Sequence, residues 1–405
     1  MEDRKILHVD VNNAFLSWTA VKMIKEGKED IRKIPSVIGG DESSRHGIVL
    51  AKSPIAKKMG IKTAMSLYEA RKICKDLKVY QPDFKTYFDL SNKFYEYLKE
   101  YSPTIERFSI DECFIDFTGT NYLYDDYIKL AHKIKDEIKE KYGFTVNVGI
   151  GENKLCAKMA SDFEKPDKVH TLFKDEIVIK MWPLKVENLF MLGKKTKEKL
   201  NKMKIYTIKD LANSDPKKLE KEFKSYGKYL YDASHGIDND EVKKREAKNK
   251  SISTEKTLKH NEIDPKKLKE TLYSQIIELG RELRSEKMYA KTVGIIYKNY
   301  MFQRYSAQAT LEEATNSNGE LYKKTIEVFD NSYRNDPIRL IGVKLSNLTK
   351  SVEKQISIFT LDEDVETNDV QETIDEINSK LGKDLIEPAS LKLIEKTKNK
   401  KSFKE

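Results

Sequence analysis

Two adjacent acids, Asp111 and Glu112, stand within the apolar run FSIDECFIDF at residues 108–117. Neighbouring side chains of a straight strand point to opposite faces, so both acids can serve one site only if the backbone turns there. An unpaired buried carboxylate is very costly, and acids in such a place usually bind a cation or each other. The segment therefore predicts the tip of a hairpin that carries a charged site.

A third acid, Asp10, ends the apolar run ILHV at residues 6–9. Strands that bring three carboxylates to one sheet edge form an oxygen-rich site of the kind that Mg²⁺ prefers. Two such ions would assist an attacking 3′-hydroxyl and neutralise a pyrophosphate leaving group. The candidate ligands are three carboxylates and one main-chain carbonyl: Asp10, Val11, Asp111 and Glu112. The alternative is that Asp10 caps a helix and the acid pair decorates a solvated turn.

The order of apolar patterns predicts several domains. Strand-like and helix-like segments alternate up to Lys165, which favours an α/β layer with the acids on one sheet. Residues 175–235 then read as short, lysine-rich helices, and residues 240–250 are polar and basic, as in a linker. From 251 to 350 strands return and alternate with helices, which predicts a separate α+β domain.

Length and charge limit the possibilities further. A chain of 405 residues predicts about three or four domains. The formal net charge of +9 suits a polyanion such as nucleic acid, although lysine used for solubility explains the bulk charge equally well. Three scattered cysteines without a CxxC pair indicate neither disulfides nor a zinc site. Neither a signal peptide nor a long apolar span is visible, so we expect a cytoplasmic protein without a membrane partner.

Taken together, the ordered motifs resemble the Y-family (translesion) DNA polymerases, and the DNA polymerase IV branch in particular. The tetrapeptide SIDE at residues 109–112 matches the family signature, and HVDVN at residues 8–12 matches its first metal-binding strand. The resemblance covers about residues 1–360. It implies that the three acids hold two Mg²⁺ ions per active site, with Glu112 nearest the primer hydroxyl.

The resemblance also implies a site for deoxynucleoside triphosphates. Phe15 falls where the family places its steric gate, a ring that leaves no room for a 2′-hydroxyl; a core aromatic is the simpler alternative. The main-chain N–H groups of Asn13 and Ala14 would face the triphosphate at a helix start. Lys165, in the string DFEKP, matches the family lysine that neutralises the triphosphate, and Lys57 is a second candidate cation.

Three positions depart from the family pattern. Asn12 stands where a second acid is common, Lys57 where arginine is usual, and Pro54 where tyrosine is usual. Exchanging arginine for lysine replaces a bidentate fork by a point charge. Nucleotide affinity and lesion preference are therefore left open.

Two C-terminal segments resemble the parts that hold primer–template DNA. LGKKTKEKL at residues 192–200 resembles a helix–hairpin–helix element in which Gly193 and Lys195 meet a phosphate, with Met191 in place of the usual first glycine. An ordinary helical turn is the alternative. Residues 251–350 look like the little-finger domain, which contacts duplex backbone without reading bases. Its candidate DNA-binding cations are Lys298, Arg304, Arg339 and Lys344.

A short peptide beyond this domain resembles a docking motif. QISIF at residues 355–359 is similar to the segment by which bacterial polymerases bind the sliding clamp, with Gln355, Ile358 and Phe359 as anchors. An additional edge strand is the alternative.

The resemblance implies a multidomain α+β fold, that of a right-hand polymerase acting as a monomer. We expect an α/β palm over residues 1–21 and 81–167, small fingers over 22–80, and a helical thumb with the helix–hairpin–helix element over 168–240. A linker follows at 241–250, then an α+β little finger at 251–350 and a tail at 351–405. The implied activity is low-fidelity, template-directed DNA synthesis past damaged template. A non-catalytic DNA-binding subunit and a nucleotidyl cyclase are rivals. The three acids disfavour the first, and the hairpin with the basic C-terminal half disfavours the second.

Overall fold

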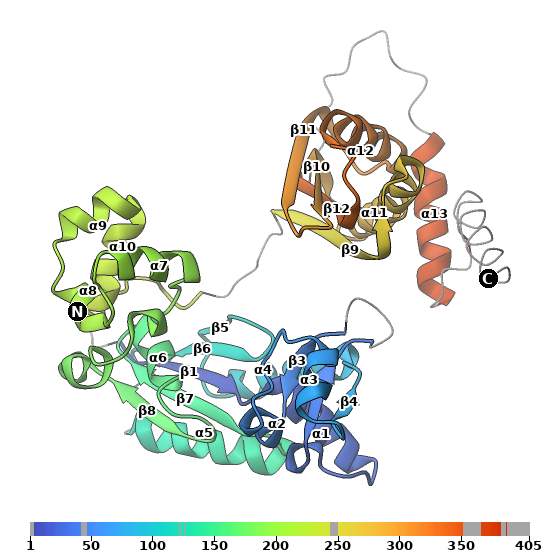
Figure 1. Cartoon of the computed structure of the whole chain (residues 1–405). Coiled ribbons are helices and arrows are strands. Elements are labelled where there is room, and N and C mark those ends of the chain that lie inside the picture. Colours follow the sequence, from blue (N-terminus) through green and yellow to red (C-terminus); the bar gives the residue numbers. More distant parts are fainter. Residues whose placement is uncertain are drawn as a thin grey trace. The chain divides into compact units, whose positions relative to one another are not determined.

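A computed structural model describes residues 4–41, 47–120, 123–124, 126–243, 250–350, 366–381 and 386. The chain divides into two compact units, residues 1–246 and 247–405, and each is considered by itself (Figure 1). The candidate clamp peptide at 355–359 lies outside the described residues, as do most of the predicted linker and tail. Within the described ranges, no helix is both long enough and apolar enough to span a bilayer.

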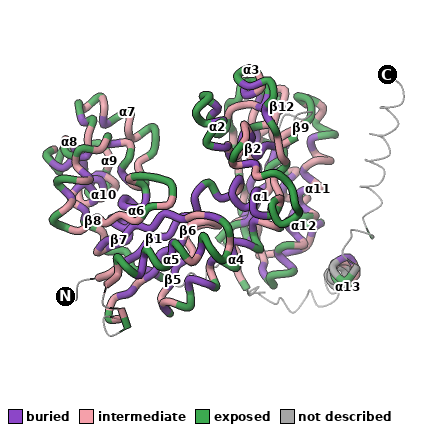
Figure 2. Tube along the Cα trace, turned by 90° about the horizontal axis from the view of Figure 1, so that it is seen from below, coloured by how far each residue is buried: buried purple, intermediate pink, exposed green. Residues whose placement is uncertain are grey.

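A five-stranded sheet is the centre of the first unit, in the order β5-β6-β1-β7-β8. The strands are β1 (Ile6–Val11), β5 (Ile105–Arg107), β6 (Glu112–Asp116), β7 (Val146–Gly151) and β8 (Val169–Leu172). Strand β1 pairs antiparallel with both β6 and β7 and is buried along its whole length (Figure 2). The predicted strand that carries Asp10 is therefore confirmed as the middle of the sheet.

Helices cover both faces of this sheet. On one face, α1 (Ala14–Lys25), α4 (Phe84–Lys99) and α5 (Tyr127–Tyr142) share a core with alternate residues of β1, among them Leu7 and Val9. On the other face lies α6 (Lys154–Ser161). His8 and Asp10 alternate with the core residues, so they project toward α6. These helices agree with the predicted amphipathic segments.

Helix α6 lies unusually close to strand β7. A Cβ atom added at Gly149 would stand 2.0 Å from the carbonyl oxygen of Ala157, and one at Gly151 would stand 2.7 Å from the nitrogen of Ala157. No other residue type leaves this space empty, so the two glycines allow the helix to rest directly on the strand.

Strand β8 continues the same sheet. It pairs parallel with β7 and lies within residues 168–240, the range that we expect for the thumb. Three of its four residues are only half buried, as befits an edge strand. The apolar pattern of such a strand is weak, which explains why sequence periodicity did not reveal it.

A small three-stranded sheet, in the order β3-β2-β4, forms the region predicted as fingers. Its elements are β2 (Ser36–Gly39), β3 (Val49–Lys52), α2 (Pro54–Lys58), α3 (Leu67–Ile73) and β4 (Lys78–Tyr80). Helix α2 begins where the Ser53 side chain accepts a hydrogen bond from Ala56 and proline occupies the first turn, both typical start signals. Strand β4 was not predicted.

Short helices follow, as predicted for residues 175–235. They are η2 (Lys174–Glu176), η3 (Ile177–Met181), η4 (Val186–Asn188), α7 (Lys194–Lys202), α8 (Ile208–Ala212), α9 (Pro216–Phe223) and α10 (Ser225–Ser234). Leu200, Leu211 and Leu230 are buried in a core of their own, to which α6 also contributes. The thumb helices and the palm helix α6 thus share one apolar cluster.

The second unit is a four-stranded antiparallel sheet, in the order β11-β10-β12-β9, with two helices on one face (Figure 1). The elements are β9 (Ser251–Glu262), α11 (Pro265–Ser285), β10 (Tyr289–Asn299), β11 (Arg304–Thr315), α12 (Asn318–Ser332) and β12 (Ile338–Thr349). A further helix, α13 (Glu366–Leu381), contacts α11 where Asp375 pairs with Arg284 at 2.6 Å. The predicted α+β domain is present.

Candidate active site

The hairpin tip brings the acids to one place. Asp10 on β1 is the direct cross-strand partner of Glu112 on β6, and the nitrogen of Val11 donates to the carbonyl oxygen of Asp111 at 3.0 Å. Asp111 lies in the turn between β5 and β6, where the backbone bends as predicted. Asp10 and Glu112, which are distant in sequence, are therefore neighbours at one edge of the sheet, and Asp111 lies in the adjoining turn.

Two ammonium groups contact two of these acids, at one oxygen of Asp10 and one oxygen of Glu112. Nζ of Lys158 lies 2.8 Å from Oε1 of Glu112 and 3.3 Å from Oδ2 of Asp10. Nζ of Lys165 lies 2.7 Å from the same Oδ2 of Asp10. Lys165 was predicted, but Lys158 was not. Its only sequence signal is its place four residues after Lys154 on one face of a helix, which usually marks a solvated surface.

Hydrogen bonding and burial tune the acids differently. Burial raises the pKa of Asp111, and the charges of Asp10 and Glu112 raise it further, against a hydrogen bond of 2.6 Å from the Ser109 hydroxyl. Burial also opposes ionisation of Glu112, but His8 and the Lys158 ammonium together hold the pKa of Glu112 below its usual range. Glu112 is therefore the more readily ionised of the adjacent pair.

His8 is a fully buried neighbour of the site that we had not predicted. The Ser161 hydroxyl donates to the carbonyl oxygen of Lys158 at 2.8 Å, so its oxygen accepts from Nδ1 of His8 at 2.8 Å. Nε2 of His8 then faces Oε2 of Glu112 at 3.7 Å, beyond hydrogen-bond distance. Burial lowers the pKa of His8.

The chemistry of the donors fits a hard divalent cation. Carboxylate and carbonyl oxygens suit Mg²⁺, whereas zinc sites favour sulfur and imidazole. In the present side-chain arrangement, no three acids, histidines or cysteines among the described residues are gathered closely enough to hold an ion. Lys158 instead links the side chains of Asp10 and Glu112.

Asn12 is a buried, uncharged side chain that connects neighbouring segments and does not add a fourth acid. Its Nδ2 donates to Oδ1 of Asn147 at 3.0 Å, and its Oδ1 accepts from the Thr145 hydroxyl and from the nitrogen of Asp167, both at 2.9 Å. A carboxylate could not donate to Asn147. This departure from the family pattern is thus explained by a buried amide that ties β1 to β7 and to the segment after Lys165.

Phe15 lies in the first turn of α1. Its ring stacks on Tyr87 with a centroid distance of 4.6 Å and an angle of 8°, and it meets Phe84 edge-on at 6.2 Å. The Tyr87 hydroxyl and the Thr19 hydroxyl are 2.8 Å apart. The Phe15 ring is only partly buried, so one part of it remains accessible while Tyr87 fixes its orientation.

Asn13 links the start of α1 to the small three-stranded sheet. It has a left-handed backbone (φ 51°), and its Nδ2 donates to the carbonyl oxygen of Lys52 at 2.8 Å. Ala14, the first residue of α1, is buried. The predicted N–H groups of Asn13 and Ala14 are therefore at a helix start, as expected.

Lys57 stands on α2 with a second lysine close by. Burial lowers the pKa of Lys52, and the positive charge of Lys57 lowers it further. Nζ of Lys52 donates to the Thr63 hydroxyl at 2.8 Å. Neither lysine has an acidic partner in the part of the chain that the structure describes.

The predicted helix–hairpin–helix residues lie at the start of α7. Gly193 is the N-cap residue, it is exposed, and it leaves the first-turn N–H groups without a capping side chain. Lys195 is exposed in that first turn. Met191 adopts φ 65°, the left-handed conformation that glycine adopts without strain.

In the second unit, three of the four predicted cations lie on the face of the sheet opposite helices α11 and α12. Register pairs Lys298 with Arg304 and with Leu340, and Lys344 with Gly294, so these side chains alternate with the core residues. Arg339 lies apart, at a β-bulge, with its guanidinium 4.7 Å from the Phe302 ring. Arg304 also pairs with Glu255 at 2.6 Å, a contact that charge counting did not predict.

Three family models match successive parts of the chain. The impB/mucB/samB family model matches residues 9–162, the DNA polymerase-iota thumb-domain model matches residues 188–238, and the impB/mucB/samB family C-terminal-domain model matches residues 249–358. Their order along the sequence follows the order of the palm, the helical segment and the second unit.

Relatives match over nearly the whole length. DNA polymerase IV of Clostridium acetobutylicum is 44% identical over 382 residues, which cover 94% of this chain and 96% of that protein. DNA polymerase IV of Alkaliphilus oremlandii is 35% identical over 404 residues, with 95% and 98% covered.

Solved structures match in fold. A Y-family DNA polymerase chimera of Dbh and Dpo4 superposes with a TM-score of 0.75 at 23% identity, over 86% of this chain and all of that one (100%). DinB from Sulfolobus solfataricus superposes with a TM-score of 0.55 at 24% identity, over 84% and 98%. These likenesses confirm the expected multidomain α+β fold of a right-hand polymerase.

Fold and sequence therefore define a DNA-directed DNA polymerase. The matches extend through the thumb and the C-terminal domain, which a nucleotidyl cyclase would not require, and they remove that alternative. The chain belongs to the Y-family of translesion DNA polymerases, in the DNA polymerase IV branch.

Proposed function

We propose that this polymerase extends a primer 3′ end past damaged template, with low fidelity and by a two-metal mechanism. The observation that carries the proposal is the cross-strand pairing of Asp10 with Glu112, with Asp111 in the adjoining turn. The family's divalent-metal requirement would be met by the three acids and the Val11 carbonyl, which fit Mg²⁺ by their oxygen chemistry. When bound, the two ions would supply the charge that stabilises the attacking and leaving oxygens.

The side chains around the acids have separate tasks in this proposal. Glu112, which is nearest the primer end in the family arrangement, remains ionised because Lys158 lowers its pKa. Lys165 and Lys57 bind the triphosphate of the incoming nucleotide, together with the N–H groups of Asn13 and Ala14. The nearby Lys52 adds charge to this anion site, which the lack of an acidic partner supports.

Phe15 is proposed to select the sugar. Its stacking on Tyr87 holds the ring in one orientation, and the exposed edge leaves no room for an additional hydroxyl. A rigid wall discriminates better than a mobile one, because the ring cannot yield without losing the stacking contact.

The remaining predicted contacts hold DNA without reading its sequence. Gly193 and Lys195 would meet a phosphate at the start of α7, where free N–H groups favour an anion. The helix-free face of the second unit would meet phosphates through Lys298, Arg304 and Lys344, with Arg339 at its margin. The small fingers check the nascent pair over little surface, which supports low fidelity.

Domain limits and partners complete the proposal. We assign palm, fingers, thumb and little finger as the sequence indicated, with the palm extended to include β8. The enzyme would act as a monomer and bind a sliding clamp through residues 355–359.

A primer-extension assay with the purified full chain, Mg²⁺ and four deoxynucleotides tests the mechanism. We expect the wild type to extend and Asp111→Asn to extend about a thousandfold more slowly, because one ligand carboxylate is lost. Fluorescence anisotropy with the same primer–template should show unchanged DNA affinity. Undiminished extension by the variant would refute the assigned role of Asp111.

A further inference from the structure

Asp162, which none of the assigned roles uses, touches both lysines of the site. Its Oδ1 lies 2.8 Å from Nζ of Lys165, and its Oδ2 lies 3.4 Å from Nζ of Lys158. The residue caps the C-terminus of α6, so the helix that delivers Lys158 also delivers this carboxylate. Asp162 is thus a fourth acid at the edge of the metal-binding group.

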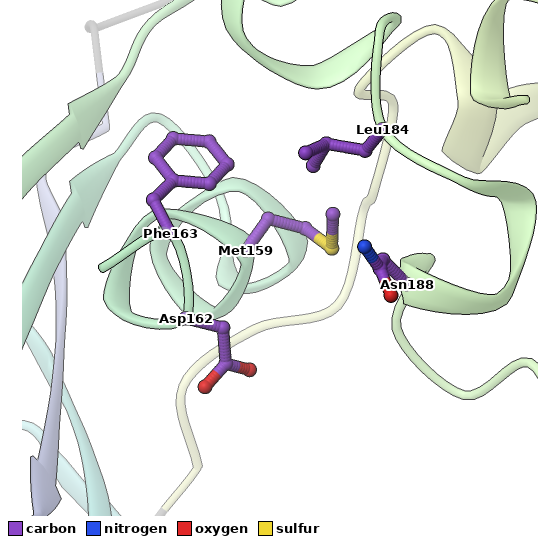
Figure 3. Close-up of a pocket in the computed structure, with 5 residues that line it drawn as sticks. All are labelled: Met159, Asp162, Phe163, Leu184 and Asn188. Carbon is purple, nitrogen blue, oxygen red and sulfur yellow. The ribbon is translucent and has the colours of Figure 1, made fainter. Parts of the chain in front are cut away.

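Its surroundings differ from those of the other acids. The Asp162 side chain is 48% exposed, whereas that of Asp10 is 8% exposed. It lines a cavity of about 320 Å³ at the junction of α6 and the thumb, together with Met159, Phe163, Leu184 and Asn188. Figure 3 shows its carboxylate turned away from Phe163 and Leu184. The carboxylate is therefore accessible to solvent, unlike that of Asp10.

Lysines and divalent ions compete for the same oxygens. Oδ2 of Asp10 is contacted by both ammonium groups, and Oε1 of Glu112 is contacted by Lys158. An ammonium group and a divalent ion repel each other, so both cannot hold one carboxylate oxygen equally well. An ion that binds these two oxygens therefore weakens the lysine contacts.

Lys158 cannot simply turn into solvent, because its side chain is only 10% exposed. A buried ammonium group that loses its carboxylate is strongly unfavourable. Its ion-pair partners in the described structure are Asp10, Glu112, Asp162 and no others, and Asp162 is the one that the metal ions leave free.

We propose that Asp162 is a positioning residue that receives the ammonium groups of Lys158 and Lys165 when divalent ions take Asp10 and Glu112. The inference rests on the metal ligands assigned above. It makes the two lysines competitors of the first ion, and it makes Asp162 the group that lowers the cost of displacing them. Lys165 is then held beside Asp162, ready for the triphosphate.

Binding of Mn²⁺ to the full chain, measured by electron paramagnetic resonance of the free ion, tests this without catalysis. D162N should weaken Mn²⁺ binding about fivefold to tenfold. Without the Asp162 carboxylate, the two lysines can pair only with Asp10 and Glu112, which the metal ion also needs. K158M should tighten it by a similar factor, because a competitor is removed. In K158M/K165M, the further change D162N should have almost no effect.

Matched variants separate this role from loss of charge. E164Q removes a carboxylate two residues away whose ion-pair partner among the described residues is Lys168, at 3.8 Å, and should leave Mn²⁺ binding within about twofold. D162E should restore most of the affinity. Near-ultraviolet circular dichroism verifies that each variant is folded. If D162N folds poorly, the Mn²⁺ affinity of K158M still tests the proposal.

Two results would overturn the inference: Mn²⁺ affinity unchanged or lowered in K158M, or a D162N effect that is equally large with and without the lysines. Either result would leave the polymerase mechanism intact, provided that D111N still loses Mn²⁺ binding and extends about a thousandfold more slowly than the wild type. Retained Mn²⁺ binding in D111N would instead refute the ligand assignment itself.

Discussion

The ammonium group of Lys154 lies 2.8 Å from Oε2 of Glu106, and the two side chains are only 10% and 1% exposed. The Phe114 ring lies 5.0 Å below the same ammonium, and the nitrogen of Lys243 donates to Oε2 of Glu106 at 3.1 Å. This buried pair joins α6 to the edge of the palm sheet and to the end of the first unit. It fixes the helix that carries Lys158.

We expect Glu106→Gln to destabilise the first unit by about 3 kcal/mol, because the Lys154 charge loses its carboxylate in a buried place. The double variant E106Q/K154M should lose less than E106Q alone. Urea unfolding followed by tryptophan fluorescence measures this, since both tryptophans, Trp18 and Trp182, lie in the first unit. Equal destabilisation of single and double variants would contradict the pairing.

Sugar selection should depend on the ring of Phe15. Phe15→Val should lower the preference for deoxynucleotides over ribonucleotides by about tenfold to a hundredfold, because the space for a 2′-hydroxyl opens. Tyr87→Phe keeps the stacking ring and should retain the preference. Single-nucleotide incorporation with matched triphosphates gives both ratios, and unchanged discrimination in Phe15→Val would exclude the gate.

Nucleotide affinity should respond to the cation at position 57. Lys57→Ala should raise the KM for deoxynucleotides about fivefold with little change in kcat, and Lys57→Arg should lower the KM, because a guanidinium can hold phosphate through two bonds. Lys58→Ala alters the neighbouring exposed lysine and serves as control. A KM that rises equally for both alanine variants would indicate only a general effect of charge.

DNA affinity should reveal which cations of the second unit are available. Lys344→Ala should reduce the slope of log affinity against log salt by about 0.9, the value of one phosphate contact. Arg304→Ala should reduce it less, because Glu255 competes for Arg304 at 2.6 Å. Glu255→Gln should strengthen DNA binding and restore the full effect of Arg304→Ala. Anisotropy titrations of the full chain across salt concentrations measure these slopes.

Clamp binding should depend on residues 355–359 alone. Deleting this segment should abolish association with a sliding clamp in size-exclusion chromatography and leave primer extension without the clamp unchanged, because no active-site residue lies there. Clamp association that survives the deletion would exclude this peptide as the docking site.

The sequence was most informative where one residue type had few possible roles. Asp10 and Glu112 interrupt apolar strands, and such acids are costly unless they form a site, so their meeting could be predicted. The long amphipathic helices and the four strands of the second unit followed from periodicity. Short edge strands, such as β8, gave too few apolar residues to stand out.

Side-chain networks between distant segments could not be predicted from the sequence. Lys158 looked like a surface lysine because its burial depends on how closely α6 approaches β7, a tertiary property. Asn12 was noted only as a departure from the family pattern, and the contacts of its amide with residues 145, 147 and 167 became visible only in the structure. The pairing of Arg304 with Glu255 depends on strand register, which sequence periodicity does not give.

Gly149 influences the electrostatics of this enzyme although it has no side chain. Because even one methyl group there would collide with Ala157, the height of Lys158 above the acids is determined by a residue without a side chain. Replacing Gly149 with alanine would lift a positive charge away from the catalytic centre while every titratable group remained in the chain. A survey of mutations that looked only at charged residues would overlook this position.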